Sequence, residues 1–100
     1  MLTVIATLKV KSDQTAAFEE EAKKMLAYVT ANEPGTLVYV CNRSTADPTL
    51  YVFYEEYRDQ AAFAAHGGSP AMQAFFGAMG GILAGRPDIA MYEEVGGKRA

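Results

Sequence analysis

The sequence predicts an α+β domain in which helices cover one face of a four-stranded antiparallel sheet. Two longer segments carry apolar residues at helical spacing, and four short segments are rich in β-branched and aromatic residues. These segments follow one another in the order β-α-β-β-α-β, which is typical of the ferredoxin-like split βαβ arrangement. The chain of 100 residues has the length of one domain, which we assign to residues 1–100.

The first half of the chain predicts one strand followed by one helix. Residues 2–10, LTVIATLKV, are apolar at nearly every position and predict a strand. Residues 13–31 predict a helix with Ser12 as its N-cap, because a serine hydroxyl can accept a free N–H of the first turn. The residues expected to form its buried stripe are Phe18, Ala22, Met25, Leu26 and Val29.

A hairpin and a helix in two parts are predicted next. Residues 36–43 and 50–57 read as strands joined by a short turn, which most simply form an antiparallel hairpin. Asp59 is expected to cap a short helix that ends at Gly67 and Gly68. Ser69 and Pro70 then restart the helix, with the serine as N-cap and the proline at the first helical position. The last strand is predicted at residues 88–95.

Both faces of the predicted sheet carry apolar residues. A sheet with this much apolar area on both sides needs a second cover, which the sheet of an identical subunit would supply with two-fold symmetry. The alternative is a monomer with scattered exposed aromatic residues. The residues on which this expectation rests are Leu37, Tyr39, Val40, Val52, Phe53, Tyr54, Met91 and Tyr92.

The composition argues against several classes of protein. The net charge is −3 and there is no run of Lys and Arg, so we expect no nucleic-acid partner. The apolar runs are shorter than the roughly 20 residues of a membrane span, so we expect no membrane partner. A single cysteine excludes an intrachain disulfide, and the N-terminus lacks the features of a signal peptide. We therefore expect a soluble, cytoplasmic protein.

Three segments resemble the antibiotic biosynthesis monooxygenase (ABM) family, and the resemblance extends over nearly the whole chain. The segments are MLTVIATLKVK, EPGTLVYVCNRSTADPTLYVFYEEYRD and AAFAAHGGSPAMQAF. The most specific features are the EPG turn, the strand end with Tyr54, Glu55 and Tyr57, and the helix pair with Phe63, His66, Ser69 and Pro70. The resemblance implies a dimeric α+β barrel built from two ferredoxin-like subunits.

Members of this family differ in chemistry. They include quinol and polyketide monooxygenases that use O₂ without flavin or metal, haem-degrading enzymes, and isomerases that process quorum signals. The haem-degrading members rely on an asparagine in the first strand, a tryptophan and a haem-ligating histidine. This chain has no asparagine in its first strand and no tryptophan, and Tyr57 stands at the position usually held by Trp. We therefore do not expect His66 to bind haem.

No cofactor and no metal are expected. The sequence has neither a G-x-G-x-x-G motif nor a P-loop, and one His and one Cys are too few for a metal triad of nitrogen and sulfur ligands. Cys41 lies within a predicted strand with no histidine near it in sequence, so we expect a small core residue rather than a nucleophile.

Oxygenation without a cofactor requires a base, an apolar cavity for an aromatic ring, and hydrogen-bond donors for a developing oxyanion. His66 is the only histidine and is the predicted catalytic base, because its reference pKa lies near neutral pH. The expected partners are a small aromatic substrate and O₂. The predicted substrate-binding residues are Tyr54 and Tyr57, the hydrophobic Phe63, Met72 and Phe76, and Arg86 for an anionic group.

Each of these roles has an alternative. His66 could instead stabilise the C-terminal end of its helix as a cation, the Phe and Met stripe could be ordinary core, and Arg86 could cap helix carbonyls. Three functions therefore stay open. The first is a monooxygenase acting on a quinol or a phenolic, polyketide-like compound. The second is an isomerase acting on a small carbonyl compound or signalling metabolite, and the third is a dimeric ligand-binding module without catalysis.

Overall fold

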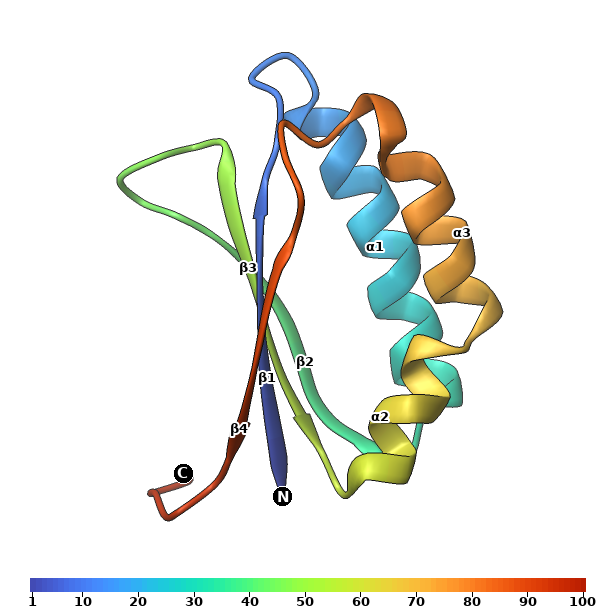
Figure 1. Ribbon diagram of the computed structural model, residues 1–100, viewed down its shortest axis with the longest axis vertical. Coiled ribbons are helices and arrows are strands. Elements are labelled where there is room, and N and C mark those ends of the chain that lie inside the picture. Colours follow the sequence, from blue (N-terminus) through green and yellow to red (C-terminus); the bar gives the residue numbers. More distant parts are fainter.

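The computed structural model describes residues 1–100 and confirms the predicted α+β fold. The sheet has the strand order β2-β3-β1-β4, and all neighbouring strands are antiparallel. Figure 1 shows the helices stacked on one face of the sheet, while the other face is left bare. The elements are β1 Leu2–Lys9, α1 Thr15–Asn32, β2 Thr36–Arg43, β3 Leu50–Tyr57, α2 Gln60–Gly67, α3 Pro70–Ala78, a short 3₁₀ helix Met79–Gly81, and β4 Asp88–Glu93.

The core lies between the sheet and the helices, and Phe18 of α1 is at its centre. Its ring lies 4.4 Å from the ring of Tyr51 and 6.1 Å from the ring of Phe75, measured between centroids. The predicted stripe of α1 is buried at Phe18, Ala22, Met25 and Val29, whereas Leu26 is half-buried. The aromatic side chains therefore connect α1 and α3 to β3.

The short helices begin where the sequence predicts. The side chain of Asp59 accepts a hydrogen bond from the backbone N–H of Ala62 at 2.8 Å, and the hydroxyl of Ser69 accepts one from Met72 at 3.1 Å. Pro70 follows as the first residue of α3, where its missing N–H costs no hydrogen bond. Both predicted caps are thus confirmed.

Two boundaries differ from the prediction by two residues. Ser12 does not cap α1, because Lys11 to Gln14 form a turn in which the Gln14 N–H donates to the Lys11 carbonyl at 2.9 Å, and the helix begins at Thr15. The last strand ends at Glu93 instead of residue 95, since its partner strand β1 runs out at Leu2, which pairs with Glu93. None of the helices is both long and apolar enough to cross a membrane.

The bare face of the sheet is apolar. Successive side chains of a strand point to opposite faces, so Tyr54 lies on the bare face while Phe53 points into the core. Val40 pairs with Tyr54 across the β2–β3 ladder and therefore shares its face, as does Tyr92, which pairs with Thr3 of β1. All three large side chains are exposed in the single chain. This face matches the second apolar surface expected from the sequence.

Candidate active site

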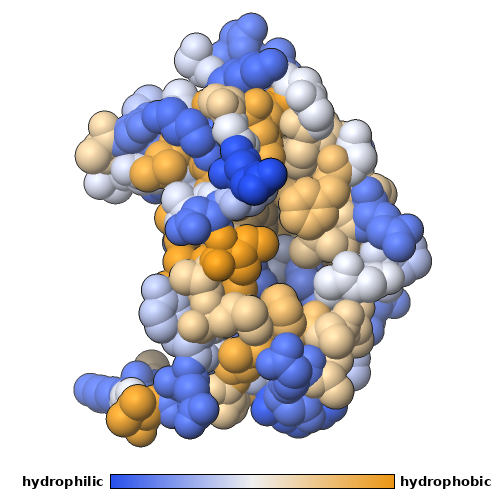
Figure 2. Space-filling model, in the orientation of Figure 1, coloured by the Kyte–Doolittle hydropathy of each residue, from blue (hydrophilic) through white to orange (hydrophobic).

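An apolar pocket of about 140 Å³ lies between the sheet and helices α2 and α3. Figure 2 shows hydrophobic side chains gathered around a hollow between the sheet and α3. Ten of its fourteen lining residues are hydrophobic, so the pocket favours an apolar ligand. The lining consists of Val4, Ala6, Leu8, Tyr39, Phe53, Glu55, Phe63, His66, Gly67, Met72, Phe75, Phe76, Pro87 and Ile89.

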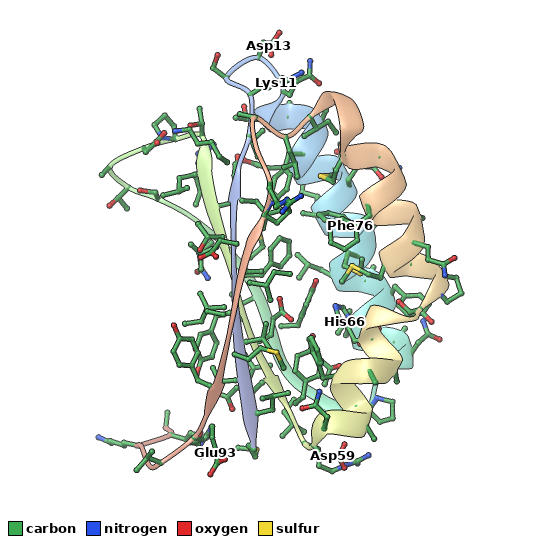
Figure 3. The ribbon with its side chains drawn as sticks, viewed as in Figure 1. Lys11, Asp13, Asp59, His66, Phe76 and Glu93 are labelled. Atoms are coloured by element: carbon green, nitrogen blue, oxygen red, sulfur yellow. The ribbon has the colours of Figure 1, made fainter.

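The imidazole of His66 lies in the wall of this pocket, in the space between α2 and the sheet (Figure 3). Only 1% of the residue is exposed, and its ring packs on the rings of Tyr39 and Tyr57 at centroid distances of 4.9 and 5.6 Å. Its Nδ1 lies 2.8 Å from Oε1 of Glu33. Neither ring nitrogen hydrogen-bonds a helix carbonyl, so the ring does not cap α2 by hydrogen bonding.

The contact with Glu33 fixes the chemistry of the other ring nitrogen. A carboxylate only accepts hydrogen bonds, so Nδ1 of His66 is the donor and the neutral ring carries its lone pair on Nε2. Nε2 is buried and has no hydrogen-bond partner in the protein. Buried polar atoms are nearly always paired, which makes an unpaired acceptor on a pocket wall a candidate site for a ligand proton.

The EPG turn explains how Glu33 reaches His66. Glu33 follows α1, and its N–H donates to the Val29 carbonyl at 3.1 Å. A Cβ atom at Gly35 would lie only 2.7 Å from Cβ of Ala62, so glycine lets this loop approach α2 closely. Thr36 donates a second hydrogen bond to Oε1 of Glu33 at 2.8 Å and helps to orient the carboxylate. The turn thus brings the carboxylate against the helix that carries the histidine.

A second carboxyl group faces the same pocket from β3. Glu55 is 5% exposed, and its Oε1 accepts a hydrogen bond of 2.6 Å from the hydroxyl of Tyr57. Burial raises the pKa of Glu55 to about 7, the hydrogen bond from Tyr57 opposes this rise, and the charge of Glu33 adds to it. Burial also raises the pKa of Tyr57 and Tyr39, so both hydroxyls stay protonated at neutral pH.

The structure brings four of the seven predicted site residues together at the pocket. They are His66, Phe63, Met72 and Phe76. Tyr57 does not line the pocket directly, but its ring packs on Phe63 at 5.3 Å and its hydroxyl holds Glu55. Tyr57 therefore contacts two residues that line the pocket and helps to hold them in place.

Tyr54 and Arg86 lie outside the pocket. Tyr54 is on the bare face of the sheet, where its hydroxyl donates to Glu56 at 2.8 Å, so it lies apart from the pocket that holds His66. Tyr54 and Tyr57 are three residues apart in a strand and must face opposite sides. Arg86 is exposed and does not line the pocket, although the adjacent Pro87 does.

Glu33 and Glu55 were not among the site residues expected from the sequence. Glu55 has the same parity as the core residue Phe53, which would have placed it on the helix side of β3. Glu33 is part of the EPG turn, but nothing local in the sequence indicates its contact with a side chain 33 positions away. Tyr39 faces the helices because it pairs with Glu55.

A larger, more polar groove of about 310 Å³ lies between α1 and β2 and includes Cys41. Oε2 of Glu19 accepts hydrogen bonds there from Arg43 and from the hydroxyl of Tyr51. Burial, followed by the charge of Glu19, raises the pKa of the Cys41 thiol to about 11. A protonated thiol is a poor nucleophile, so Cys41 does not provide this groove with an activated thiol. No group of three or more His, Cys, Asp or Glu residues is placed to hold a metal ion.

Comparisons with solved structures find the same fold in related proteins. A candidate antibiotic biosynthesis monooxygenase of Caulobacter crescentus is 39% identical with a TM-score of 0.91, covering 95% of this chain and 90% of that chain. A candidate antibiotic biosynthesis monooxygenase of Nitrosomonas europaea is 26% identical with a TM-score of 0.87, covering 95% of this chain and 99% of that chain. A conserved protein of Methanosarcina mazei shares the fold, with 22% identity and a TM-score of 0.87. The match covers 93% of this chain and 91% of that chain.

The family can be stated from the sequence match as well. No curated protein is significantly similar to the chain. The family model described as antibiotic biosynthesis monooxygenase matches residues 1–78, which include α1, the β2–β3 hairpin, α2 and α3. With this match over more than half of its length, the chain belongs to the antibiotic biosynthesis monooxygenase family.

Proposed function

We propose that this protein is a monooxygenase that oxidises a quinol or phenolic substrate with O₂ and without a cofactor. One observation carries the proposal: Nε2 of His66 is buried and unpaired on the wall of an apolar pocket, while Nδ1 is held by Glu33. A base positioned in this way is the group that such a reaction needs first. The family described above supports the same class of chemistry.

The reaction begins with proton transfer from a substrate hydroxyl to Nε2 of His66. The Glu33 carboxylate keeps the ring in the right tautomer and stabilises the imidazolium that forms. The resulting phenolate is electron-rich and donates an electron to O₂. One oxygen atom then enters the ring as a new C–O bond and the other leaves as water. Hydroquinone and O₂, for example, give hydroxyquinone and water, with all the electrons supplied by the quinol.

The hydrophobic lining has two roles in this scheme. Side chains such as Phe63 and Met72 hold the flat ring, and they exclude water from the anion once it has formed. An open pocket also distinguishes this proposal from a binding module whose interior is filled by its own side chains.

The decisive experiment measures O₂ consumption and the transfer of an oxygen atom from O₂ to the product. Reduced benzoquinone or naphthoquinone is supplied with ¹⁸O₂, and O₂ consumption and the product mass are measured with and without the protein. We expect consumption faster than in buffer and one labelled atom in the product. Consumption at the buffer rate, or peroxide formation with no label in the product, would refute the proposal.

We further propose that two chains form a homodimer through the bare face of the sheet. The exposed Val40, Tyr54 and Tyr92 make this face apolar, and members of the family are typically dimeric. Sedimentation of the native protein is expected to give twice the 10.8 kDa mass of one chain.

A charge in this interface should break the dimer. Val40→Asp would bury an unpaired carboxylate against the partner sheet, so we expect a shift to monomers. Lys23→Asp, on the exposed side of α1, is the matched control and should leave the mass unchanged. A native protein that sediments as a monomer, or equal masses for native protein and Val40→Asp, would contradict the proposal.

A further inference from the structure

Glu55 is a buried ionisable group that the mechanism above does not use. Its Oε1 is held by the hydroxyl of Tyr57, and its second oxygen has no hydrogen-bond partner in the protein. It lines the same pocket as His66, and these two residues supply the only carboxyl group and the only imidazole of an otherwise mainly hydrophobic lining. An apolar pocket with two convergent polar groups indicates a ligand with polar atoms of its own.

The two groups are close neighbours in the fold. Tyr39 pairs with Glu55 across the β2–β3 ladder, and Tyr57 follows Glu55 by two positions on the same face. The ring of His66 packs on both of these tyrosines. The structure nevertheless contains no hydrogen bond between Glu55 and His66. Because both residues line the same pocket, a ligand in it can contact both groups.

The environment of Glu55 gives it the ability to donate a hydrogen bond. Burial raises its pKa to about 7, so near neutral pH a large fraction of the carboxyl group carries its proton. A neutral carboxylic acid can donate to a substrate oxygen while its other oxygen accepts from Tyr57. His66 acts differently, since its Nε2 accepts a proton.

The size of the pocket limits the ring system. An apolar cavity of about 150 Å³ in another protein is known to hold benzene. The pocket volume of about 140 Å³ is close to that value and suits one six-membered ring. Phe76 and Ile89 line the pocket and are about half exposed, so they mark the rim past which a substituent on the ring can extend.

We propose that Glu55 is a second substrate-contacting residue, and that the pocket selects a single aromatic ring with two oxygen substituents. One hydroxyl gives its proton to Nε2 of His66, and the other oxygen accepts a hydrogen bond from the carboxyl group of Glu55. This inference rests on the proposed quinol oxidation and specifies its substrate class.

Binding measured without O₂ tests the inference separately from turnover. Anaerobic calorimetry would compare phenol, hydroquinone and reduced naphthoquinone on the full chain. We expect hydroquinone to bind about tenfold more tightly than phenol, as one extra hydrogen bond would provide. Reduced naphthoquinone should bind more weakly than hydroquinone, because its second ring exceeds the pocket.

Three variants make the test specific. Glu55→Met keeps the length of the side chain but removes its polar end, so it should bring the hydroquinone-to-phenol ratio close to one and leave phenol binding within about twofold. Glu55→Gln retains a donor and should restore most of the ratio. Glu20→Gln, on the exposed surface of α1, should behave like the native protein.

The outcomes separate this inference from the proposed function. Equal binding of phenol and hydroquinone by the native protein, or a ratio unchanged in Glu55→Met, would show that Glu55 does not contact the substrate. Tighter binding of reduced naphthoquinone than of hydroquinone would overturn the single-ring assignment. Discrimination by the native protein that is lost in Glu55→Met, without any O₂ consumption, would support the role of Glu55 and overturn the oxygenase proposal alone.

Discussion

Replacement of His66 by alanine is expected to lower the rate of quinol-dependent O₂ consumption by about 10² to 10⁴. Nε2 of His66 is the unpaired acceptor on the pocket wall, and no second imidazole exists in the chain to replace it. Without a base, the substrate hydroxyl must lose its proton to water, so little phenolate is available to react. The initial rate at saturating quinol, followed with an oxygen electrode, measures the effect.

The alanine variant also removes a partner of Glu33, so a change in folding must be separated from a change in chemistry. His66→Gln keeps an amide that can donate to Glu33 but cannot take up a proton, and it should show a loss of similar size. Gln73→Ala, on the exposed surface of α3, is the matched control and should keep the native rate within about twofold. A folded His66→Ala protein with the native rate would exclude His66 as the base.

The second large effect concerns stability and pH. The free energy of unfolding should decrease as the pH rises from about 4.5 to about 7, because the native protein keeps the proton of Glu55 up to its raised pKa of about 7. An unfolded chain releases that proton near the reference value of 4.5. The native state therefore binds more protons than the unfolded state in this window. The resulting decrease in the free energy of unfolding is about 3 kcal/mol at most.

Glu55→Gln isolates this contribution. The amide resembles the protonated carboxyl group and can still accept from Tyr57, so the variant should match the native protein at about pH 5 and exceed its stability by up to about 3 kcal/mol at about pH 8. Urea denaturation at the two pH values measures the difference, with Glu20→Gln as control. The hydrogen bond from Lys9 lowers the pKa of Asp47 below its usual value of 3.8. Asp47 therefore stabilises the folded protein above about pH 4, and this contribution is lost as the pH falls further. Parallel pH profiles for native protein and Glu55→Gln would show that Glu55 titrates normally.

Much of the fold could be predicted because its determinants are local. The caps at Asp59 and Ser69 act within three residues, and the buried stripe of α1 follows from helical periodicity. The prediction for Ser12 failed for a reason that is also local. Ser12 is a good capping residue, but a turn from Lys11 to Gln14 forms there and the helix begins later.

The site was less predictable because it depends on contacts between distant segments. His66 could be singled out as the only histidine, but its hydrogen bond to Glu33 exists because the loop at Gly35 packs closely on Ala62. Tyr54 and Tyr57 were assigned to one site although strand geometry allows only one of them on each face. The volume of the pocket follows from how α3 packs on the sheet, which no local pattern specifies.

The close contact between Gly35 and Ala62 has a consequence for how such proteins could diversify. It secures the imidazole and its carboxylate at the junction of α1 and α2, whereas Met72, Phe76 and Ile89 come from α3 and β4. Substitutions of those three side chains can change the volume of the pocket while His66 keeps its orientation. Under the proposed mechanism, substitutions in one wall of the pocket would change the accepted substrate without disturbing His66 and its contact with Glu33.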